Sequence, residues 1–132
     1  MTRSEKDRLD ITILGSGTCV PSLRRSSCAL LMETGGVKWL FDCGAGTLRR
    51  LLETGTEIFD IDTIFLSHFH PDHSGELVSF LFATKYPEKK RRKHPLKLAG
   101  GLGLLRFFEN LKQVYGDWIV LGPGMLEIIE LD

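Results

Sequence analysis

The run from Ser67 to Gly75 constrains this chain more than any other part of its sequence. It reads Ser-His-Phe-His-Pro-Asp-His-Ser-Gly and directly follows Ile61–Leu66, a compact apolar segment typical of a strand buried on both faces. Apolar residues at helical spacing resume at Leu77. We therefore expect the run to form a strand-to-helix loop in a fold that alternates strands and helices.

Four side chains of this run are of the types that bind metals. His68 and His70 are two residues apart, so in extended backbone both imidazoles project to the same side and can bind one ion. Asp72 and His73 follow at once, and four donors in so short a loop favour two ions. Imidazole and carboxylate without a nearby thiolate favour Zn2+, and Mn2+ and Fe2+ accept the same donors. Two adjacent ions activate water and stabilise charge developing on a phosphoryl or carbonyl oxygen, which is hydrolytic chemistry.

Two other residues are candidates to support these ligands. The hydroxyl of Ser67 lies beside the first ligand, and Asp42 ends another predicted strand, Val37–Asp42. Each can orient a His through its second ring nitrogen. For Asp42, a structural role in a turn is the alternative.

The rest of the chain predicts one α/β domain. We expect residues 1–9 to form a flexible N-terminal tail and residues 10–132 to form a single folded unit, since 132 residues rarely divide into two domains. The expected elements are strands over Leu9–Leu14, Cys28–Glu33, Val37–Asp42, 96–98 and Met125–Leu131, and helices after Gly46, from Leu77 and over Leu104–Tyr115. Phe107, Phe108, Tyr115 and Trp118 are expected in the core.

Charge and cysteine content exclude several classes of protein. Seventeen basic residues balance seventeen acidic ones, so net charge predicts neither general nucleic-acid binding nor a membrane surface. The basic run Lys89–Lys93 is interpreted as a solvated loop, with RNA contact as the alternative and His94 as a surface residue. The charged N-terminus and the lack of a long apolar run indicate a cytoplasmic protein. The odd number of cysteines, Cys19, Cys28 and Cys43, predicts semi-buried reduced thiols.

The order of these features resembles the metallo-β-lactamase superfamily, and most closely its ribonuclease Z-like hydrolases. The resemblance covers nearly the whole chain and rests on Gly15–Pro21, Arg25-Ser-Ser27, Phe41–Thr47 and above all the His-x-His-x-Asp-His core. It implies an αβ/βα sandwich of four layers with the metals at one edge. This chain would form the N-terminal half of that sandwich, a mixed β-sheet flanked by helices.

The resemblance also implies roles for the residues of the run. His68 and His70 match the ligands of the first zinc, whereas Asp72 and His73 match those of the second. Asp72 also matches a residue with a catalytic proton-transfer role. Near relatives hydrolyse phosphodiesters, including tRNA 3′ precursors, and remoter ones hydrolyse thioesters and β-lactams.

Two departures from the family pattern shape the expected function. Family members draw further ligands from the second half of the fold, but after His73 this sequence offers only His94, and Asp117 and Asp132 have no ligand neighbours. It also lacks a recognisable Gly-rich tRNA-clamping arm. We therefore expect a truncated chain that binds metal weakly, is nearly or wholly inactive alone, and self-associates through an exposed half-sandwich face.

Three functions follow in order of preference. The first is a binuclear zinc-dependent phosphodiesterase of the ribonuclease Z type. The second is a thioester hydrolase of the hydroxyacylglutathione type with the same metals. The third is a non-catalytic fragment or interaction module, which the missing second-half ligands favour for the chain alone.

Overall fold

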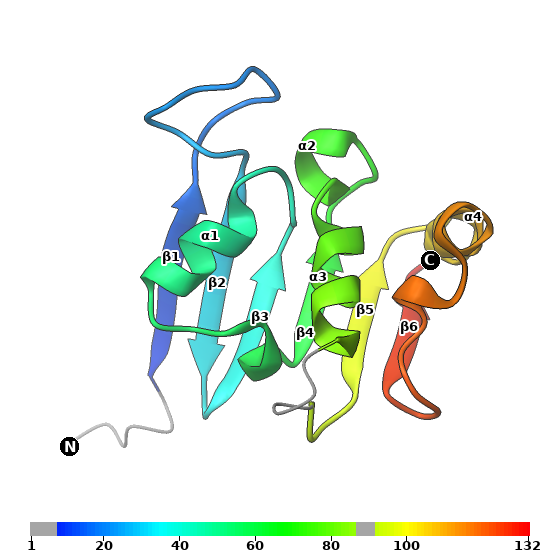
Figure 1. Cartoon of the computed structure of the whole chain (residues 1–132). Helices are drawn as coiled ribbons and strands as arrows, with labels where there is room; N and C mark the ends of the chain where they lie inside the picture. Colours follow the sequence, from blue (N-terminus) through cyan, green and yellow to red (C-terminus); the bar gives the residue numbers. More distant parts are fainter. Residues whose placement is uncertain (1–7, 87–91) are drawn as a thin grey trace.

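The computed structural model describes residues 8–86 and 92–132, which form one six-stranded mixed sheet (Figure 1). The strands lie in chain order across the sheet, β1-β2-β3-β4-β5-β6. The first three pair antiparallel and the remaining pairs are parallel, which confirms the predicted mixed sheet. Their bounds are β1 Leu9–Gly15, β2 Ala29–Thr34, β3 Val37–Phe41, β4 Thr63–Leu66, β5 Leu96–Gly100 and β6 Leu126–Glu130.

Helices occupy the three connections between the parallel strands, because such strands need a crossover to run in the same direction. They are α1 Thr47–Glu53, α2 Pro71–Ser74, α3 Leu77–Lys85 and α4 Leu104–Tyr115, with 3-10 turns η2 Ile58–Asp60 and η3 Gly116–Ile119. Carboxylates from distant segments accept hydrogen bonds from the backbone N–H groups at the starts of two helices. Glu76 accepts from the backbone N–H groups of Gly46 and Leu48 before and in α1, and Glu130 accepts from those of Gly103 and Leu105 at α4.

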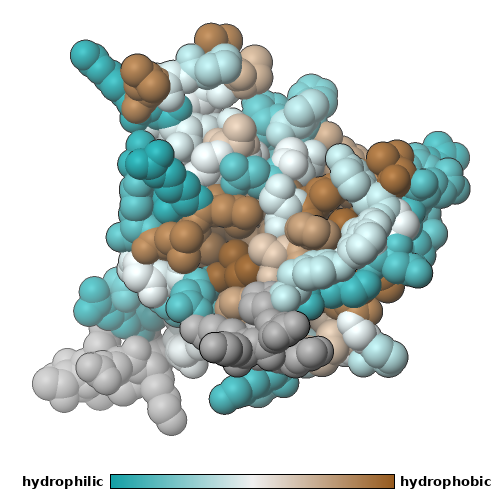
Figure 2. Space-filling view, viewed as in Figure 1, coloured by the Kyte–Doolittle hydropathy of each residue, from teal (hydrophilic) through white to brown (hydrophobic). Residues whose placement is uncertain are grey.

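The hydrophobic core lies between the sheet and the helices on one face. Leu31, Leu40 and Ile64 of neighbouring strands are fully buried there, against Leu51 of α1 and Phe80 of α3. Figure 2 views the molecule from this helix side and shows hydrophobic surface between the helices and hydrophilic surface along both lateral margins. The described residues therefore form two layers, one of sheet and one of helices.

The opposite face of the sheet carries apolar side chains that are only partly covered. One row of partners crosses all six strands: Ile13, Leu30, Phe41, Phe65, Ala99 and Ile129. Ile13 is 64% exposed and its strand neighbour Ile11 is 58% exposed. The rings of Phe41 and Phe65 lie 5.7 Å apart in the middle of this face. We refer to this surface as the open sheet face.

The structure corrects several expectations about single residues. Leu9 pairs with Thr34 as the first residue of β1, which agrees with the predicted strand Leu9–Leu14 and not with a tail that extends to residue 9. Residues 1–7 of the predicted tail lie outside the described residues. Tyr115 and Trp118 are 44% and 58% exposed rather than core residues. The short turn η3 after α4 buries Ile119 instead, and Trp118 packs its ring near Tyr86, at 5.7 Å.

Of the remaining expectations about the core and the cysteines, some are confirmed and others are wrong. Phe108 is buried and Phe107 packs against the core, as expected. Cys43 is fully buried, whereas Cys19 and Cys28 are exposed rather than semi-buried. Across the described residues, no helix combines the length and the apolar character that crossing a membrane requires.

Candidate metal centre

The Ser67–Gly75 run, called the His loop below, connects β4 to α3 as predicted and contains the single helical turn α2. His70 is extended, with φ −60° and ψ 147°, and Pro71 begins α2. Proline suits this first helical position because its φ is already helical and its missing N–H would have no partner there. The single turn of α2 carries Asp72 and His73, and the Ser74 hydroxyl donates to the carbonyl of His70 at 3.0 Å, closing the turn.

The loop brings the predicted ligand side chains together. The His68 ring lies 4.6 Å from the His70 ring and 4.1 Å from the His73 ring, measured between centroids. Oδ2 of Asp72 lies 3.4 Å from Nε2 of His73. Three imidazoles and one carboxylate therefore form one cluster where β4 ends.

Asp42 and Ser67 each contact a different histidine of this cluster. Oδ2 of Asp42 lies 2.7 Å from Nδ1 of His73, and the Ser67 hydroxyl lies 3.0 Å from Nδ1 of His68. Ser67 also donates its backbone N–H and its hydroxyl to Asp42, both at 2.8 Å. Asp42 is buried and has a φ of 63°, a conformation that Asp and Asn tolerate better than most residues. Asp42 thus both adopts the turn conformation and contacts a predicted metal ligand, so the two alternatives predicted for it are both observed.

The donor types of the cluster fit zinc. With their Nδ1 atoms engaged by Ser67 and Asp42, His68 and His73 each keep Nε2 for a metal, which is how ligating histidines are commonly held. Within residues 8–86 and 92–132, however, no three His, Cys, Asp or Glu side chains are arranged to hold one ion together. The cluster therefore matches zinc in chemistry without showing a complete coordination shell.

Residues that the sequence reasoning did not select hold the His loop in place. The Cys43 N–H donates to the His73 carbonyl at 2.7 Å, and the Glu76 N–H donates to the Cys43 carbonyl at 2.8 Å. A Cβ on Gly44 would overlap the carbonyl of Asp72. Burial, followed by the charges of Glu76 and Asp42, raises the pKa of the Cys43 thiol, so this thiol stays protonated. The only sequence feature that pointed to these contacts was the Asp42-Cys-Gly element, which the chain shares with the ribonuclease Z-like family.

Within the basic run after α3, Arg92 differs from the solvated loop residue that the composition suggests. Most of Lys89–Lys93 lies outside the described residues, but Arg92 is buried and donates to the carbonyls of Ile61 and Ile58 at 2.5 and 2.6 Å. Burial lowers the pKa of its guanidinium. Arg92 is thus part of the packing, whereas His94 is exposed as expected.

Comparison with protein families gives one family model that matches residues 9–102, described as anti-Pycsar protein Apyc1. Among curated proteins, a ribonuclease Z from Brevibacillus brevis is 36% identical over 105 residues, which cover 78% of this chain and 32% of the relative. The zinc phosphodiesterase ELAC protein 1 of Bos taurus is 35% identical over 100 residues, covering 75% and 28%. The chain thus spans about a third of the length of these relatives.

Solved structures agree with this comparison. The short form of human tRNase Z superposes with a TM-score of 0.72 and 28% identity, covering 92% of this chain and 46% of that one. The metallo-β-lactamase fold protein YhfI of Bacillus subtilis superposes with a TM-score of 0.73 at 22% identity, covering 96% and 47%. The sheet and helices described above are thus the arrangement found in metallo-β-lactamase fold proteins.

Proposed function

This chain belongs to the anti-Pycsar protein Apyc1 family, among the ribonuclease Z-like proteins of the metallo-β-lactamase superfamily, and we propose that it contributes the His loop to a zinc-dependent phosphodiesterase. The observation that carries the proposal is the cluster at the end of β4, where the His68 ring lies 4.1 Å from the His73 ring and Asp42 holds Nδ1 of His73. The names of the relatives, ribonuclease Z and zinc phosphodiesterase, support a phosphodiester substrate over a thioester.

We assign His68 and His70 to one zinc and Asp72 and His73 to a second. Bound zinc would act as a Lewis acid that activates water and stabilises charge on the phosphoryl oxygens. Asp42 keeps the His73 ring oriented, and Ser67 does the same for His68. Asp72, whose Oδ2 lies 3.4 Å from Nε2 of His73, is the residue that accepts and returns a proton during hydrolysis.

Metal binding by single variants tests this assignment. We expect His68→Ala and His70→Ala to lose zinc affinity in a chelator competition, whereas His94→Ala, which removes an exposed histidine away from the cluster, retains it. Equal affinity in all three variants would contradict the site. Four donors shared by two ions leave each ion short of a tetrahedral shell, so we expect less than two tightly bound zinc ions per chain by elemental analysis.

Substrate class is tested by hydrolysis. Bis(p-nitrophenyl) phosphate and a glutathione thioester, each assayed with a longer relative and with this chain under zinc, separate the two hydrolase hypotheses. We expect cleavage of the phosphodiester by the relative and little turnover by the 132-residue chain. Preferential thioester cleavage by the relative would replace the phosphodiesterase assignment with the thioester hydrolase.

The open sheet face supports a proposal about partners, that a second copy of this chain covers it. Its apolar row crosses all six strands, and Ile11 and Ile13 on the edge strand are mostly exposed. A net charge of zero produces little repulsion between copies. Light scattering at micromolar concentration should give a mass above one chain for the native protein and one chain for an Ile11→Lys, Ile13→Lys variant. Val114→Lys, on an exposed position of α4, is the control, and a native mass of one chain would exclude self-association.

A further inference from the structure

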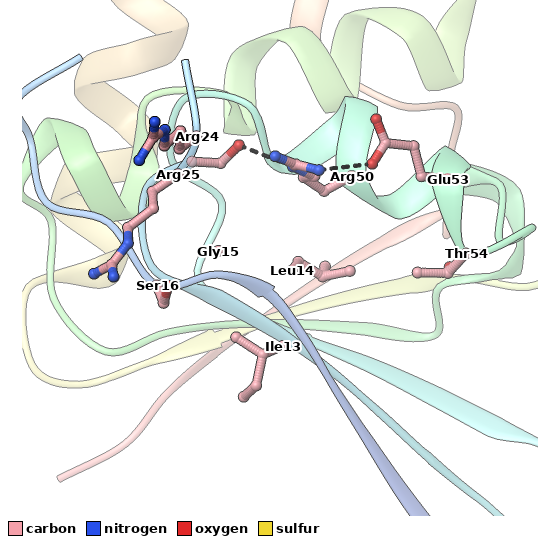
Figure 3. A pocket seen from close by; sticks show the side chains of 10 residues that line it. Ile13, Leu14, Gly15, Ser16, Arg24, Arg25, Arg50, Glu53 and Thr54 are labelled. Atoms are coloured by element: carbon pink, nitrogen blue, oxygen red, sulfur yellow. Dashed lines mark hydrogen bonds and ion pairs between the residues drawn. The ribbon is translucent and has the colours of Figure 1, made fainter. Parts of the chain in front are cut away.

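A second polar site lies one backbone segment away from the His loop. It is a pocket of about 320 Å3 between the end of β1, the loop that follows it and α1 (Figure 3). Gly44 packs against both the Asp72 carbonyl and Ser27, and Gly46 packs against the Ser26 hydroxyl that lines the pocket. The Gly44–Gly46 segment therefore separates this pocket from the metal-binding cluster.

The pocket concentrates positive charge in a chain whose net charge is zero. Its lining includes Arg24, Arg25 and Arg50 against Glu53 alone, so three positive charges and one negative charge leave a net charge of +2. Figure 3 shows Arg24 and Arg25 on the same side of the pocket, with their guanidinium groups apart, and Arg50 between that side and Glu53. The charge is thus a local property of this pocket and not of the whole surface.

The arginines differ in how they are held. Arg50 pairs with Glu53 at 2.9 Å and approaches the Ser26 hydroxyl at 3.4 Å, so its position is fixed by its neighbours. For Arg24 and Arg25, the part of the chain that the structure describes provides no carboxylate within ion-pair distance. Each of these two guanidinium groups therefore lacks a counter-charge from the described residues, which a bound anion would supply.

We propose that this pocket binds a phosphate group of the substrate, distinct from the phosphodiester that is cleaved. One guanidinium can donate two parallel hydrogen bonds to phosphate oxygens, and the hydroxyls of Ser16 and Ser26 in the pocket lining are neutral donors. The volume of about 320 Å3 lies at the lower end of the range for small-ligand pockets. The identification of the ligand as substrate rests on the proposed phosphodiesterase function, whereas the binding of phosphate rests on the pocket alone.

Binding measured without metal tests the pocket independently of catalysis. The probe is a fluorescein-labelled single-stranded RNA decamer, titrated with the 132-residue chain in EDTA and followed by anisotropy. We expect Arg24→Gln, Arg25→Gln to weaken binding by about tenfold or more and to lower the salt dependence, with a log–log slope smaller by about 0.7 for each phosphate that is no longer neutralised. Arg49→Gln is the matched control, because Arg49 lies on α1 beside Arg50, is 88% exposed and does not line the pocket.

Competition distinguishes the source of the phosphate. Full displacement of the decamer by cytidine monophosphate would indicate a site for single phosphate esters, and displacement only by an unlabelled decamer would indicate a strand-binding site. No binding by the native chain, or an equal loss in Arg49→Gln, would overturn the inference. Native binding in EDTA together with no hydrolysis by longer relatives would instead contradict the proposed function and leave this pocket standing. Thermal denaturation confirms that each variant is folded.

Discussion

Asp42 Oδ2 lies 2.7 Å from Nδ1 of His73, and the same carboxylate accepts two hydrogen bonds from Ser67. One buried side chain at the end of β3 therefore fixes both ends of the metal-binding cluster, through His73 directly and through Ser67 to His68. Its positive φ limits which residues can replace it.

Replacing Asp42 by asparagine should reduce metal binding with little effect on folding. Asparagine tolerates the φ of 63° but supplies no negative charge to His73, and partners of this kind typically contribute about 10- to 100-fold in metal affinity. The measurement is zinc affinity by chelator competition beside the thermal midpoint. Asp42→Ala serves as the contrast, since it should also lose about 1–3 kcal/mol of stability by leaving the Ser67 N–H without its acceptor. An asparagine variant with native affinity would show that the contact does not orient the ligand.

A methyl group at Gly44 should displace the His loop. Its Cβ would overlap the Asp72 carbonyl and crowd Ser27, and both of these groups are held by the surrounding backbone. We expect Gly44→Ala to lower the free energy of unfolding by about 2 kcal/mol or more, measured by urea denaturation. Gly101→Ala is the control, because nothing lies within 4 Å of the Cβ it would add. Similar stability in both variants would mean that the loop has room to shift.

Arg92 should contribute to stability and not to RNA binding. Its guanidinium donates to the carbonyls of Ile61 and Ile58 from a buried position, so Arg92→Ala leaves both carbonyls without this donor and opens a cavity. The expected loss is about 2–4 kcal/mol in the free energy of unfolding, with no change in the salt dependence of decamer binding. Lys93→Ala, which removes the exposed neighbouring side chain, should leave the free energy of unfolding unchanged. A reduced salt slope for Arg92→Ala would restore the basic run as an RNA contact.

The three cysteines should react in two classes. Cys19 and Cys28 are exposed and Cys43 is buried, so a thiol reagent should label the first two in the native protein and the third only on unfolding. Mass spectrometry of the alkylated peptides makes the assignment. Rapid labelling of Cys43 in the folded protein would show that the segment beside the His loop opens readily.

The same thiol predicts a pH dependence of stability. Burial raises the pKa of Cys43 above its ordinary value of 9.0, so the folded thiol keeps its proton while the unfolded one loses it. Its stabilising contribution is present below pH 9.0 and decreases as the pH rises above that value, by up to about 1.4 kcal/mol per pH unit. Urea denaturation of the native protein and of Cys43→Ala between about pH 8 and 10 measures it. Parallel curves for the two proteins would exclude Cys43 as the cause.

The sequence predicted the elements better than it predicted the surroundings of single residues. Alternating and helical periodicities located the strands and helices, and the dense pattern of donors located the His loop, because both signals are local. The burial of Arg92 and the exposure of Trp118 depend instead on contacts with distant segments: the Ile58 and Ile61 carbonyls for the first, and the turn of η3 for the second. Composition identifies a charge run and an aromatic residue, and only packing decides where each lies.

The prediction of the site shows the same division. The cluster of His68, His70, Asp72 and His73 was predicted from their spacing. The contact of Asp42 with His73 joins residues 31 positions apart, and the sequence left open whether Asp42 orients a histidine or only forms a turn. The arginine pocket was not predicted at all. Arg24, Arg25 and Arg50 share no motif spacing, and the loop after β1 has to fold against α1 before they meet.

The uninterrupted order of the strands also affects how the chain acquires its structure. Every strand after β1 pairs with the strand that precedes it in the chain, so each new strand adds to an edge that already exists. Each pairing therefore closes only the loop between two consecutive strands, and its entropic cost is limited to that loop. No strand needs a partner that is distant in the sequence. The sheet can therefore assemble during translation, from β1 toward β6, in the order in which the ribosome delivers the strands.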